Sequence, residues 1–253
     1  MQAVLPAAGR GTRMGPLSEH RPKPLVPVGG TPLLAHALDA VRSVVDEAVI
    51  VVGYRGERIR ERFGTTYRGL PLTVVEQSER RGLADALARA ESVVDGPFVH
   101  LNADNVFGTD PGGAANVRRL VERRRETAAD AVLLVERVSR EAARRVGVVQ
   151  TDGDGRVRDV VEKPDDPPTR LVQTGCFAFT PRIFDACRAV EPGDTGEVEL
   201  SDAVARLARA GRVETVRLCG WRRNVNTPFD RAAVEARLAG ERARRASSGR
   251  LDT

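Results

Sequence analysis

Apolar residues in this chain form short continuous runs that alternate with stretches of helical spacing. Residues 4–8 and 48–52 are two such runs, rich in Val and Ala, and a glycine closes each of them. Between them, after Thr31-Pro32, apolar side chains recur over residues 33–41 at intervals of three and four. A short apolar run bounded by turn residues predicts a buried strand, and the three-to-four spacing predicts an amphipathic helix.

The same alternation continues to about residue 240. Further strands are expected at residues 72–76, 97–101, 131–138, 146–149, 157–161, 172–179 and 213–218. Further helices are expected over 57–63, within 110–126, from Ser139, from Pro181, over 203–210 and from Thr227-Pro228 to about Leu238. Strands that alternate with helices predict an α/β fold, in which helices cover both faces of a largely parallel sheet.

Composition agrees with a soluble protein that has a sizeable core. Of the 253 residues, 41% are hydrophobic and 4% aromatic, so we expect a core of Val, Leu and Ala. Three scattered cysteines form no C-x-x-C pair, which favours reduced thiols in a cytosolic protein. The chain shows no signal peptide and no apolar run of membrane-spanning length, and these absences lead us to expect a cytoplasmic location and no membrane partner.

The net charge of +5 could indicate a nucleic-acid partner, but the charge pattern argues against one. Arginines over residues 118–125 alternate with Glu122 and Glu126, which is typical of a solvated helix face, and no aromatic stacking platform accompanies them. We therefore rank a nucleic-acid-binding domain last among the alternatives. Lysine occurs only at Lys23 and Lys163, which makes these two positions conspicuous.

A glycine-rich loop follows the first predicted strand directly. Gly9 and Gly11 would allow the backbone to approach a ligand closely, and successive N–H groups of such a loop can bind phosphate oxygens. Arg13 and Lys23 add positive charge, as a polyphosphate requires. The segment lacks the third glycine of the dinucleotide fingerprint and the G-K-[ST] ending of a P-loop. Two glycines alone would equally suit a tight turn after a strand.

The whole string G-x-G-T-R-M-x-P-L-S-x-x-x-P-K-P is more specific, and it resembles the N-terminal motif of the sugar-1-phosphate nucleotidyltransferases. The resemblance continues at intervals to about Asp230. It implies a three-layer, Rossmann-like fold with a mixed, mainly parallel sheet. It also implies a loop that binds a nucleoside triphosphate through Ala7, Ala8, Gly9, Gly11, Thr12 and Arg13, with Arg13 and Lys23 in catalytic roles.

Two further segments extend the expected nucleotide site. The resemblance implies that Gln77 and the backbone at Gly82 bind the base; an amide, with its donors beside an acceptor, suits the edge of a pyrimidine. A surface glutamine and a helix cap are the plain alternative. Asp104 follows a predicted strand within Asn102-Ala103-Asp104-Asn105, which resembles the family's G-D-N motif. A carboxylate at a strand end is a suitable Mg²⁺ ligand, so Asp104 is the expected metal-binding and catalytic acid.

The expected sugar-phosphate site comes from later segments. A hairpin with its turn at residues 152–155 leads into Glu162-Lys163-Pro164, which resembles the family's E-K-P motif. The resemblance implies that Glu162 binds sugar hydroxyls and Lys163 the sugar phosphate. On an extended chain these adjacent side chains would point to opposite sides, so they need not neutralise each other. The further residues expected at this site are Asn105, Gly147, Thr174, Gly175 and Trp221.

Two positions depart from the family pattern. Trp221 to Pro228 resembles W-x-[DN]-x-x-T-P with an offset of one residue, which places Asn224 where an acidic second metal ligand is usual. An amide oxygen can bind Mg²⁺ but brings no charge. Thr195 stands where the thymidylyltransferase branch commonly has arginine, which weakens assignment to that branch. Glu197, two residues later, could orient the sugar loop or simply begin the next helix.

The chain shows no internal repeat and no sharp change in composition. We predict one nucleotidyltransferase domain over residues 1–240, with a sugar-binding insertion at about 139–200 and a flexible polar tail over 241–253. The expected reaction joins a nucleoside triphosphate, dTTP or UTP first, to a sugar 1-phosphate, glucose 1-phosphate by default, with Mg²⁺ as cofactor. CTP or a purine nucleotide with a specialised sugar or cyclitol phosphate stays open, as do a homo-oligomer and a catalytically weak regulatory protein that binds nucleotide sugars.

Overall fold

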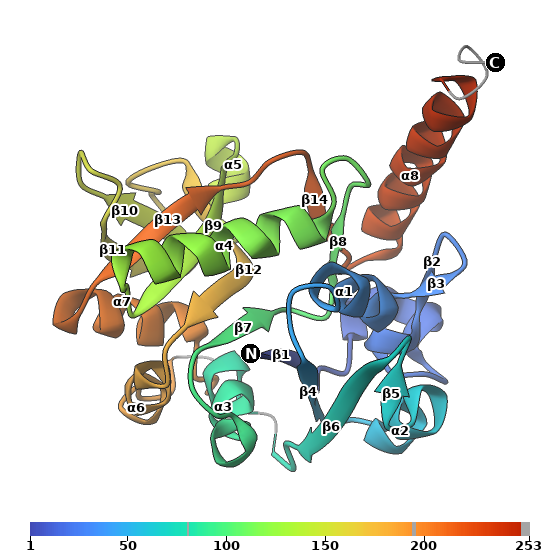
Figure 1. The fold of residues 1–253 in the computed structure, drawn as a ribbon, viewed down its shortest axis with the longest axis horizontal. Coiled ribbons are helices and arrows are strands. Elements are labelled where there is room, and N and C mark those ends of the chain that lie inside the picture. Colours follow the sequence, from blue (N-terminus) through green and yellow to red (C-terminus); the bar gives the residue numbers. More distant parts are fainter. Residues whose placement is uncertain (80, 194–195, 249–253) are drawn as a thin grey trace.

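The structure is a computed structural model that describes residues 1–79, 81–193 and 196–248 (Figure 1). Its main strands are β1 (Gln2–Ala7), β4 (Glu47–Val52), β5 (Thr66–Tyr67), β6 (Leu70–Glu76), β7 (Phe98–Leu101), β9 (Ala131–Arg137), β10 (Val148–Thr151), β11 (Val157–Val161), β12 (Leu171–Phe179) and β13 (Val213–Arg217). Within the described residues, these strands form one mixed sheet in the order β11-β10-β12-β7-β1-β4-β6-β5, with β9 beside β12 and β13 beside β9.

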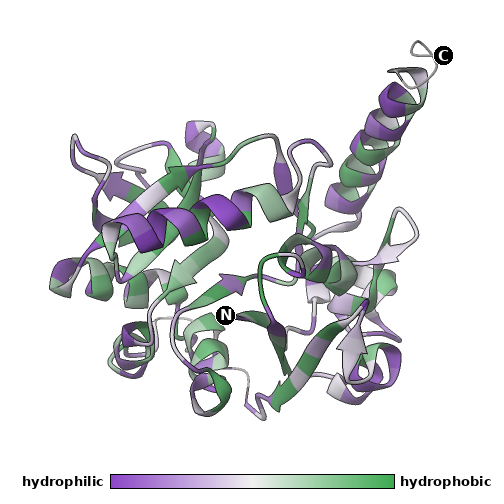
Figure 2. Ribbon diagram, in the orientation of Figure 1, coloured by the Kyte–Doolittle hydropathy of each residue, from purple (hydrophilic) through white to green (hydrophobic). Residues whose placement is uncertain are grey.

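Helices cover both faces of this sheet. They are α1 (Leu33–Val41), α2 (Gly56–Phe63), α3 (Leu83–Ala88), α4 (Gly113–Thr127), α5 (Arg140–Ala143), α6 (Arg182–Arg188), α7 (Leu200–Ala210) and α8 (Pro228–Ser248). Side chains of β1 alternate between two clusters: Leu5 packs with α1, α2 and α4, whereas Val4 packs with α3, α6 and α7. The fold therefore has the predicted three layers, and Figure 2 shows central strands that are mainly hydrophobic and helices with hydrophilic outward turns.

The register of the parallel strands brings the predicted motifs to one edge of the sheet. β1 pairs with β4 from Gln2↔Glu47 to Ala7↔Val52, and β4 pairs with β6 as far as Val52↔Glu76. β7 runs parallel to β1 on its other side. The glycine loop, Gln77 and the segment after Leu101 thus all leave the sheet at its carboxyl edge, where ligands bind in folds of this class.

Two small ladders and three short 3₁₀ helices complete the described structure. β2 (Pro27–Val28) pairs with β3 (Thr31–Pro32), so the first helix begins at Leu33, just after the expected Thr31-Pro32 start. β8 (Asn105–Phe107) pairs with β14 (Arg222–Asn224). The 3₁₀ helices are η1 (Thr12–Ser18), η2 (Lys23–Leu25) and η3 (Glu91–Val93). The segment predicted as an insertion is part of the main sheet, since it contributes β10, β11 and β12.

The last helix extends beyond the predicted end at Leu238. Its first half packs through Val234 and Leu238 beside Trp221, and the helix then continues to Ser248 and projects from the body (Figure 1). Residues 241–248, expected as a flexible tail, are helical because their Ala, Arg and Glu content favours helix. Glu241 also accepts a 2.7 Å hydrogen bond from the hydroxyl of Thr109. Residues 249–253 lie outside the described residues. None of the described helices combines the length and apolar character needed to cross a membrane.

Candidate active site

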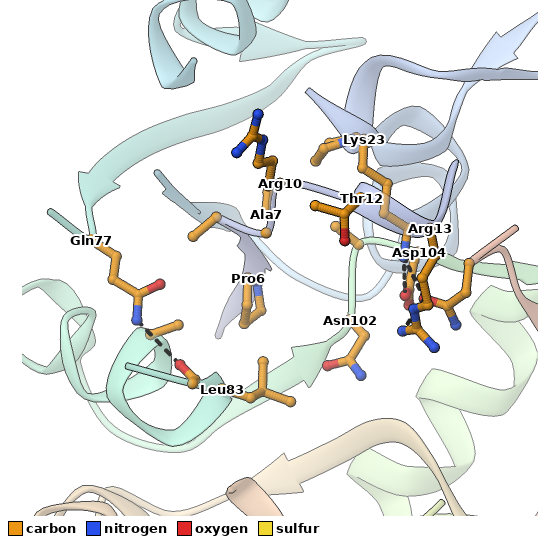
Figure 3. A pocket seen from close by; sticks show the side chains of 18 of the residues that line it. Pro6, Ala7, Arg10, Thr12, Arg13, Lys23, Gln77, Leu83, Asn102 and Asp104 are labelled. Carbon is orange, nitrogen blue, oxygen red and sulfur yellow. Dashed lines mark hydrogen bonds and ion pairs between the residues drawn. The ribbon is translucent and has the colours of Figure 1, made fainter. Parts of the chain in front are cut away.

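A cavity of about 610 Å³ opens at the carboxyl edge of the sheet (Figure 3). It is bounded by the loop after β1, by the start of α3 and by the segment after β7. Every residue predicted to bind the nucleotide contributes to its lining: Ala7, Ala8, Gly9, Gly11, Thr12, Arg13, Gln77, Gly82 and Asp104. The tertiary structure therefore brings together residues that the sequence separates by nearly a hundred positions.

The two glycines of the loop have different structural requirements. Gly11 has φ of 73°, and a Cβ there would lie 2.5 Å from Cβ of Lys23. Gly11 thus lets the Lys23 stem pack directly against the loop, in a backbone conformation that side chains disfavour. Gly9 does not have a positive φ, and a Cβ there would meet nothing within 4 Å. Only Gly11 is required by the protein's own packing.

Lys23 is the centre of the charged cluster in this cavity. Its Nζ donates to Oδ2 of Asp104 at 2.6 Å and to Oδ1 of Asn226 at 2.8 Å. Arg13 reaches the same Asn226 oxygen at 3.3 Å, and Figure 3 shows both cations converging on Asp104. The side chains of Lys23 and Asp104 are only 13% and 20% exposed, so their charges interact with limited screening by water.

Asn226, rather than Asn224, presents its carbonyl oxygen to this cluster. The amide nitrogen of Asn224 donates to Oδ1 of Asp104 at 2.9 Å, while its oxygen accepts a hydrogen bond from Arg222. Both ends of Asn224 are therefore engaged, which does not suit the metal-binding role expected from the sequence. The β8–β14 ladder positions Asn226, because the backbone N–H of Val225 donates to the Asp104 carbonyl at 3.0 Å.

The oxygen pair of Asp104 and Asn226 suits a small divalent cation. Such ions prefer carboxylate and carbonyl oxygens and retain several water or phosphate ligands. The Lys23 ammonium already bridges these two oxygens, which shows that a positive charge fits between them. Within the described part of the chain, no group of three or more His, Cys, Asp or Glu side chains could hold a metal. A metal here would therefore depend on ligand phosphates to complete its coordination.

A second cavity of about 200 Å³ adjoins the first, and Leu83, Asn102 and Asn226 line both. Four residues predicted for the sugar site line it: Gly147, Glu162, Thr174 and Gly175. Gly175 has φ of 75°, and a Cβ there would lie 2.4 Å from Nδ2 of Asn102. A Cβ on Gly147 would lie 2.2 Å from Nε2 of Gln173. Both glycines therefore make room for side chains of the protein itself.

Glu162 and Lys163 form an ion pair, contrary to the expectation that they point to opposite sides. Lys163 has φ of 43°, so the chain is not extended there, and its Nζ lies 2.9 Å from Oε1 of Glu162. The same ammonium lies 3.2 Å from Oε1 of Glu199. Partial burial opposes the charge on Lys163, but the two carboxylates outweigh it and raise the pKa of Lys163. Burial and the nearby Glu162 charge raise the pKa of Glu199.

Besides Lys163, two residues predicted for the sugar site, Asn105 and Trp221, line neither cavity. Asn105 is fully buried; its amide donates to the Thr174 carbonyl at 3.0 Å and its oxygen accepts from Arg222 at 3.0 Å. Trp221 packs in the cluster beneath α8, where its indole N–H donates to Glu241. The local motif resembled a binding motif, but the fold uses both side chains for internal packing.

A buried histidine holds Asn102, a residue that lines both cavities. His100 is completely buried, and its Nε2 lies 2.8 Å from Oδ1 of Asn102. Since that oxygen can only accept, Nε2 carries the proton and Nδ1 is left without a partner in the described structure. Burial lowers the pKa of His100 to about 4, so the imidazole is neutral at neutral pH.

Several lining residues were not predicted from the sequence. Asn102 was noticed only as part of its motif, and Asn226, Glu199 and Arg145 were not assigned to a site, although all four line the cavities. Asn226 lies next to the T-P pair of the motif containing Asn224, so shifting that alignment by two residues would have found it. Glu197 lines the first cavity, whereas Thr195 lies outside the described residues.

The positions of Lys23 and Arg13 indicate the class of protein. Both side chains line the first cavity and bond Asn226, which lines both cavities. A transferase that joins two phosphate-bearing molecules needs positive charge at such a place. The family model described as "Nucleotidyl transferase" matches residues 2–222. The chain therefore belongs to the nucleotidyltransferase family, which confirms the resemblance seen in the sequence; enzymes of this family generally use a divalent metal.

Curated relatives agree with this assignment. The chain is 43% identical over 243 residues to UTP–glucose-1-phosphate uridylyltransferase AglF of Haloferax volcanii, covering 95% of this chain and 98% of that protein. It is 31% identical over 230 residues to the bifunctional protein GlmU of Methanocaldococcus jannaschii. That match covers 91% of this chain but only 52% of GlmU, so the chain spans about half the length of that relative.

Solved structures confirm the fold. A UDP-glucose pyrophosphorylase complexed with UDP-glucose superposes with a TM-score of 0.84 at 23% identity, covering 93% of this chain and 97% of that one. A putative glucose-1-phosphate thymidylyltransferase from Bacillus anthracis superposes with a TM-score of 0.83 at 24% identity, covering 94% and 95%. The architecture is thus that of the nucleotidyltransferases.

Proposed function

We propose that this protein transfers a uridylyl or thymidylyl group from UTP or dTTP to a sugar 1-phosphate, with UTP and glucose 1-phosphate as the leading pair. The observation that carries the proposal is the junction of the two cavities, where Lys23, Asp104 and Asn226 meet. The near full-length similarity to AglF supports UTP and glucose 1-phosphate as the first substrates to test.

In the proposed reaction, a phosphate oxygen of the sugar 1-phosphate attacks the α-phosphorus of the nucleotide. A new oxygen–phosphorus bond forms, the bond from the α-phosphorus to the bridging oxygen breaks, and pyrophosphate leaves with those electrons. The attacking group is already an anion, so no protein nucleophile and no general base are needed. The protein instead brings two anions together and stabilises the charge that develops on the leaving group.

The charged side chains have distinct roles in this proposal. Arg13 and the loop N–H groups from Gly9 to Thr12 hold the departing phosphates, and Lys23 lies beside the reacting phosphate. Asp104 and Asn226 would hold Mg²⁺, which supplies positive charge to the phosphates when bound. Lys23 would exchange its present bonds to these two oxygens for bonds to phosphate. This exchange keeps its charge paired before and during the reaction.

The second cavity would hold the sugar phosphate. Glu162, which accepts a hydrogen bond from Ser201, presents carboxylate oxygens suited to sugar hydroxyls. Arg145 and Arg222 line the cavity, but Arg222 is nearly buried and paired with Glu136. Arg145, together with Lys163, which is paired with two glutamates that line the cavity, would therefore bind the sugar phosphate. Binding the phosphate through Lys163 requires at least one of those ion pairs to open.

The direct test is pyrophosphate release from a matrix of five nucleoside triphosphates against several sugar 1-phosphates, with Mg²⁺ and with EDTA. We expect the highest rate with UTP or dTTP and a hexose 1-phosphate, and loss of activity with EDTA. Turnover confined to CTP or a purine nucleotide would contradict the proposed base. Tight binding of a nucleotide sugar without turnover of any pair would instead support the regulatory alternative.

A further inference from the structure

The amide of Gln77 is held in one orientation. Its nitrogen donates to Oδ2 of Asp85 at 2.7 Å and to the carbonyl oxygen of Gly82 at 3.2 Å. Both partners can only accept hydrogen bonds, so they identify which end of the amide is nitrogen. Gln77 is 4% exposed, and its place in the cavity wall leaves it little freedom to rotate.

The amide oxygen is consequently the atom that Gln77 offers to a ligand. Figure 3 shows this oxygen directed into the cavity, away from the start of α3. Among the described residues, it accepts no hydrogen bond, whereas both N–H groups are occupied. Gln77 therefore presents a fixed acceptor to the base, although a free glutamine could present either a donor or an acceptor.

Reversing the amide would be costly. The reversed amide would place its oxygen against the Asp85 carboxylate and the Gly82 carbonyl, leaving three acceptors together without a proton in a poorly hydrated wall. Asp85 is itself held in place, because its Oδ1 accepts from Arg89 at 3.2 Å and its side chain is only 16% exposed. Asp85 thus controls which end of Gln77 faces the nucleotide.

We propose that Asp85 is a specificity-determining positioning residue: by holding the amide nitrogen of Gln77, it makes the site select a pyrimidine with a ring N–H. Uracil and thymine carry a proton on N3, which a fixed acceptor can bind. Cytosine has an unprotonated N3, whose lone pair would face the oxygen of Gln77. This inference rests on the proposed uridylyl or thymidylyl transfer, and it predicts that CTP is a poor substrate because of the orientation of one side chain.

The test compares UTP with CTP in the wild type and in Asp85→Asn. The asparagine keeps the size of Asp85 but can offer either an oxygen or an N–H, so Gln77 can adopt both orientations. We expect the ratio of kcat/KM for UTP to that for CTP to fall about tenfold or more, the size of one hydrogen bond. The change should appear in the KM of the nucleotide and leave the KM of the sugar phosphate unaltered. Calorimetric titration with UDP and CDP should show the same loss of discrimination without any turnover.

Two further variants keep the result interpretable. Arg89→Gln removes the other partner of Asp85 but leaves the bond to Gln77, so its UTP-to-CTP ratio should match the wild type. Asp85→Ala removes the charged acceptor of the amide nitrogen and leaves only the 3.2 Å bond to the Gly82 carbonyl, so it should lower the ratio as Asp85→Asn does. Thermal unfolding of each variant shows that it is folded before its specificity is compared.

The outcomes separate this inference from the proposed function. If the wild type prefers UTP to CTP and both Asp85 variants keep that preference, Asp85 has no positioning role although the function stands. A wild type that uses CTP as well as UTP would overturn the fixed-acceptor argument. A wild type that turns over no pyrimidine nucleotide would overturn the proposed function itself.

Discussion

The first cavity, proposed to bind the nucleotide, and the second cavity, proposed to bind the sugar phosphate, are built in different ways. The first is lined by short segments that directly follow parallel strands, and its cations face the cavity. The second is lined by residues of β12, the E-K-P segment and the start of α7, and its positive groups are paired with acids. Lys163 lies between Glu162 and Glu199, and Arg222 lies 2.6 Å from Glu136.

From this difference we expect the two proposed sites to bind phosphate with different degrees of preorganisation. In the first cavity, Lys23 must leave Asp104 to bind phosphate, but Arg13 bonds the neutral amide of Asn226 and pairs with no acid among the described residues, so this cation needs little rearrangement. On the sugar side, the phosphate competes with existing ion pairs. We therefore expect substitutions on the nucleotide side to affect turnover and those on the sugar side to affect the apparent affinity for the sugar phosphate.

The largest effect is expected for Lys23→Ala. The substitution removes the cation nearest the reacting phosphate, and loss of one such group typically lowers kcat by about 10²- to 10³-fold. Pyrophosphate release measures the effect, and circular dichroism shows whether the fold is retained. Arg21→Ala is the matched control, since Arg21 is an exposed cation two residues away that lines neither cavity. Turnover equal to that of the control would contradict the role of Lys23.

His100, which contacts Asn102 in the wall between the two cavities, should make the free energy of unfolding depend on pH. Its folded pKa of about 4 lies below its ordinary value of 6.5, so only the unfolded chain binds this proton between the two values. The stabilisation that the neutral His100 gives the folded protein is fully present above pH 6.5 and is lost as the pH falls towards 4. By linkage, the free energy of unfolding should fall by about 2 kcal/mol between pH 7 and pH 5.

Urea unfolding at several pH values measures this dependence, with His100→Phe as the comparison. The phenylalanine suits the aromatic surroundings of Phe177 and Phe179 and cannot bind a proton. We expect its pH profile to be flatter than that of the wild type over this range. Parallel profiles for the two proteins would show that His100 does not titrate as described.

The two glycines of the loop, Gly9 and Gly11, can be compared with each other, and the expected effects on stability are smaller. Gly11→Ala combines a positive φ with a contact to Lys23, and we expect a loss of stability of about 2 kcal/mol. Gly9→Ala meets no neighbour and should change the free energy of unfolding by less than about 0.5 kcal/mol. Denaturant unfolding of both variants measures the difference. Equal losses would show that the two glycines are not distinguished by packing.

The smallest effect is expected for Lys163→Ala on the sugar side. Loss of one exposed phosphate-binding cation should raise the KM for the sugar phosphate about tenfold, while the KM for the nucleotide changes little. Asp165→Asn, an exposed substitution in the same loop, is the control. A larger change in kcat than in KM would place Lys163 at the reacting centre and remove the contrast between the two sides.

The sequence alone determined the class of fold and pointed to the residues that line the first cavity. Apolar runs and helical spacing are local, so β1, α1, β4 and most later elements begin and end within a few residues of their predicted positions. The glycine loop, Arg13, Lys23, Gln77 and Asp104 were also identifiable, because they belong to motifs that resemble those of the family. The loop, Gln77 and Asp104 also follow strands whose carboxyl ends must lie at the same edge of a parallel sheet.

Only the tertiary structure decided how the remaining side chains are used. The β8–β14 ladder selects Asn226 over Asn224 by pairing segments more than a hundred residues apart. The same ladder and α8 commit Asn105 and Trp221 to internal contacts, and the left-handed backbone at Lys163 creates an ion pair that an extended chain would not form. A motif fixes residue types and spacing, but the direction of a side chain depends on partners that are distant in sequence.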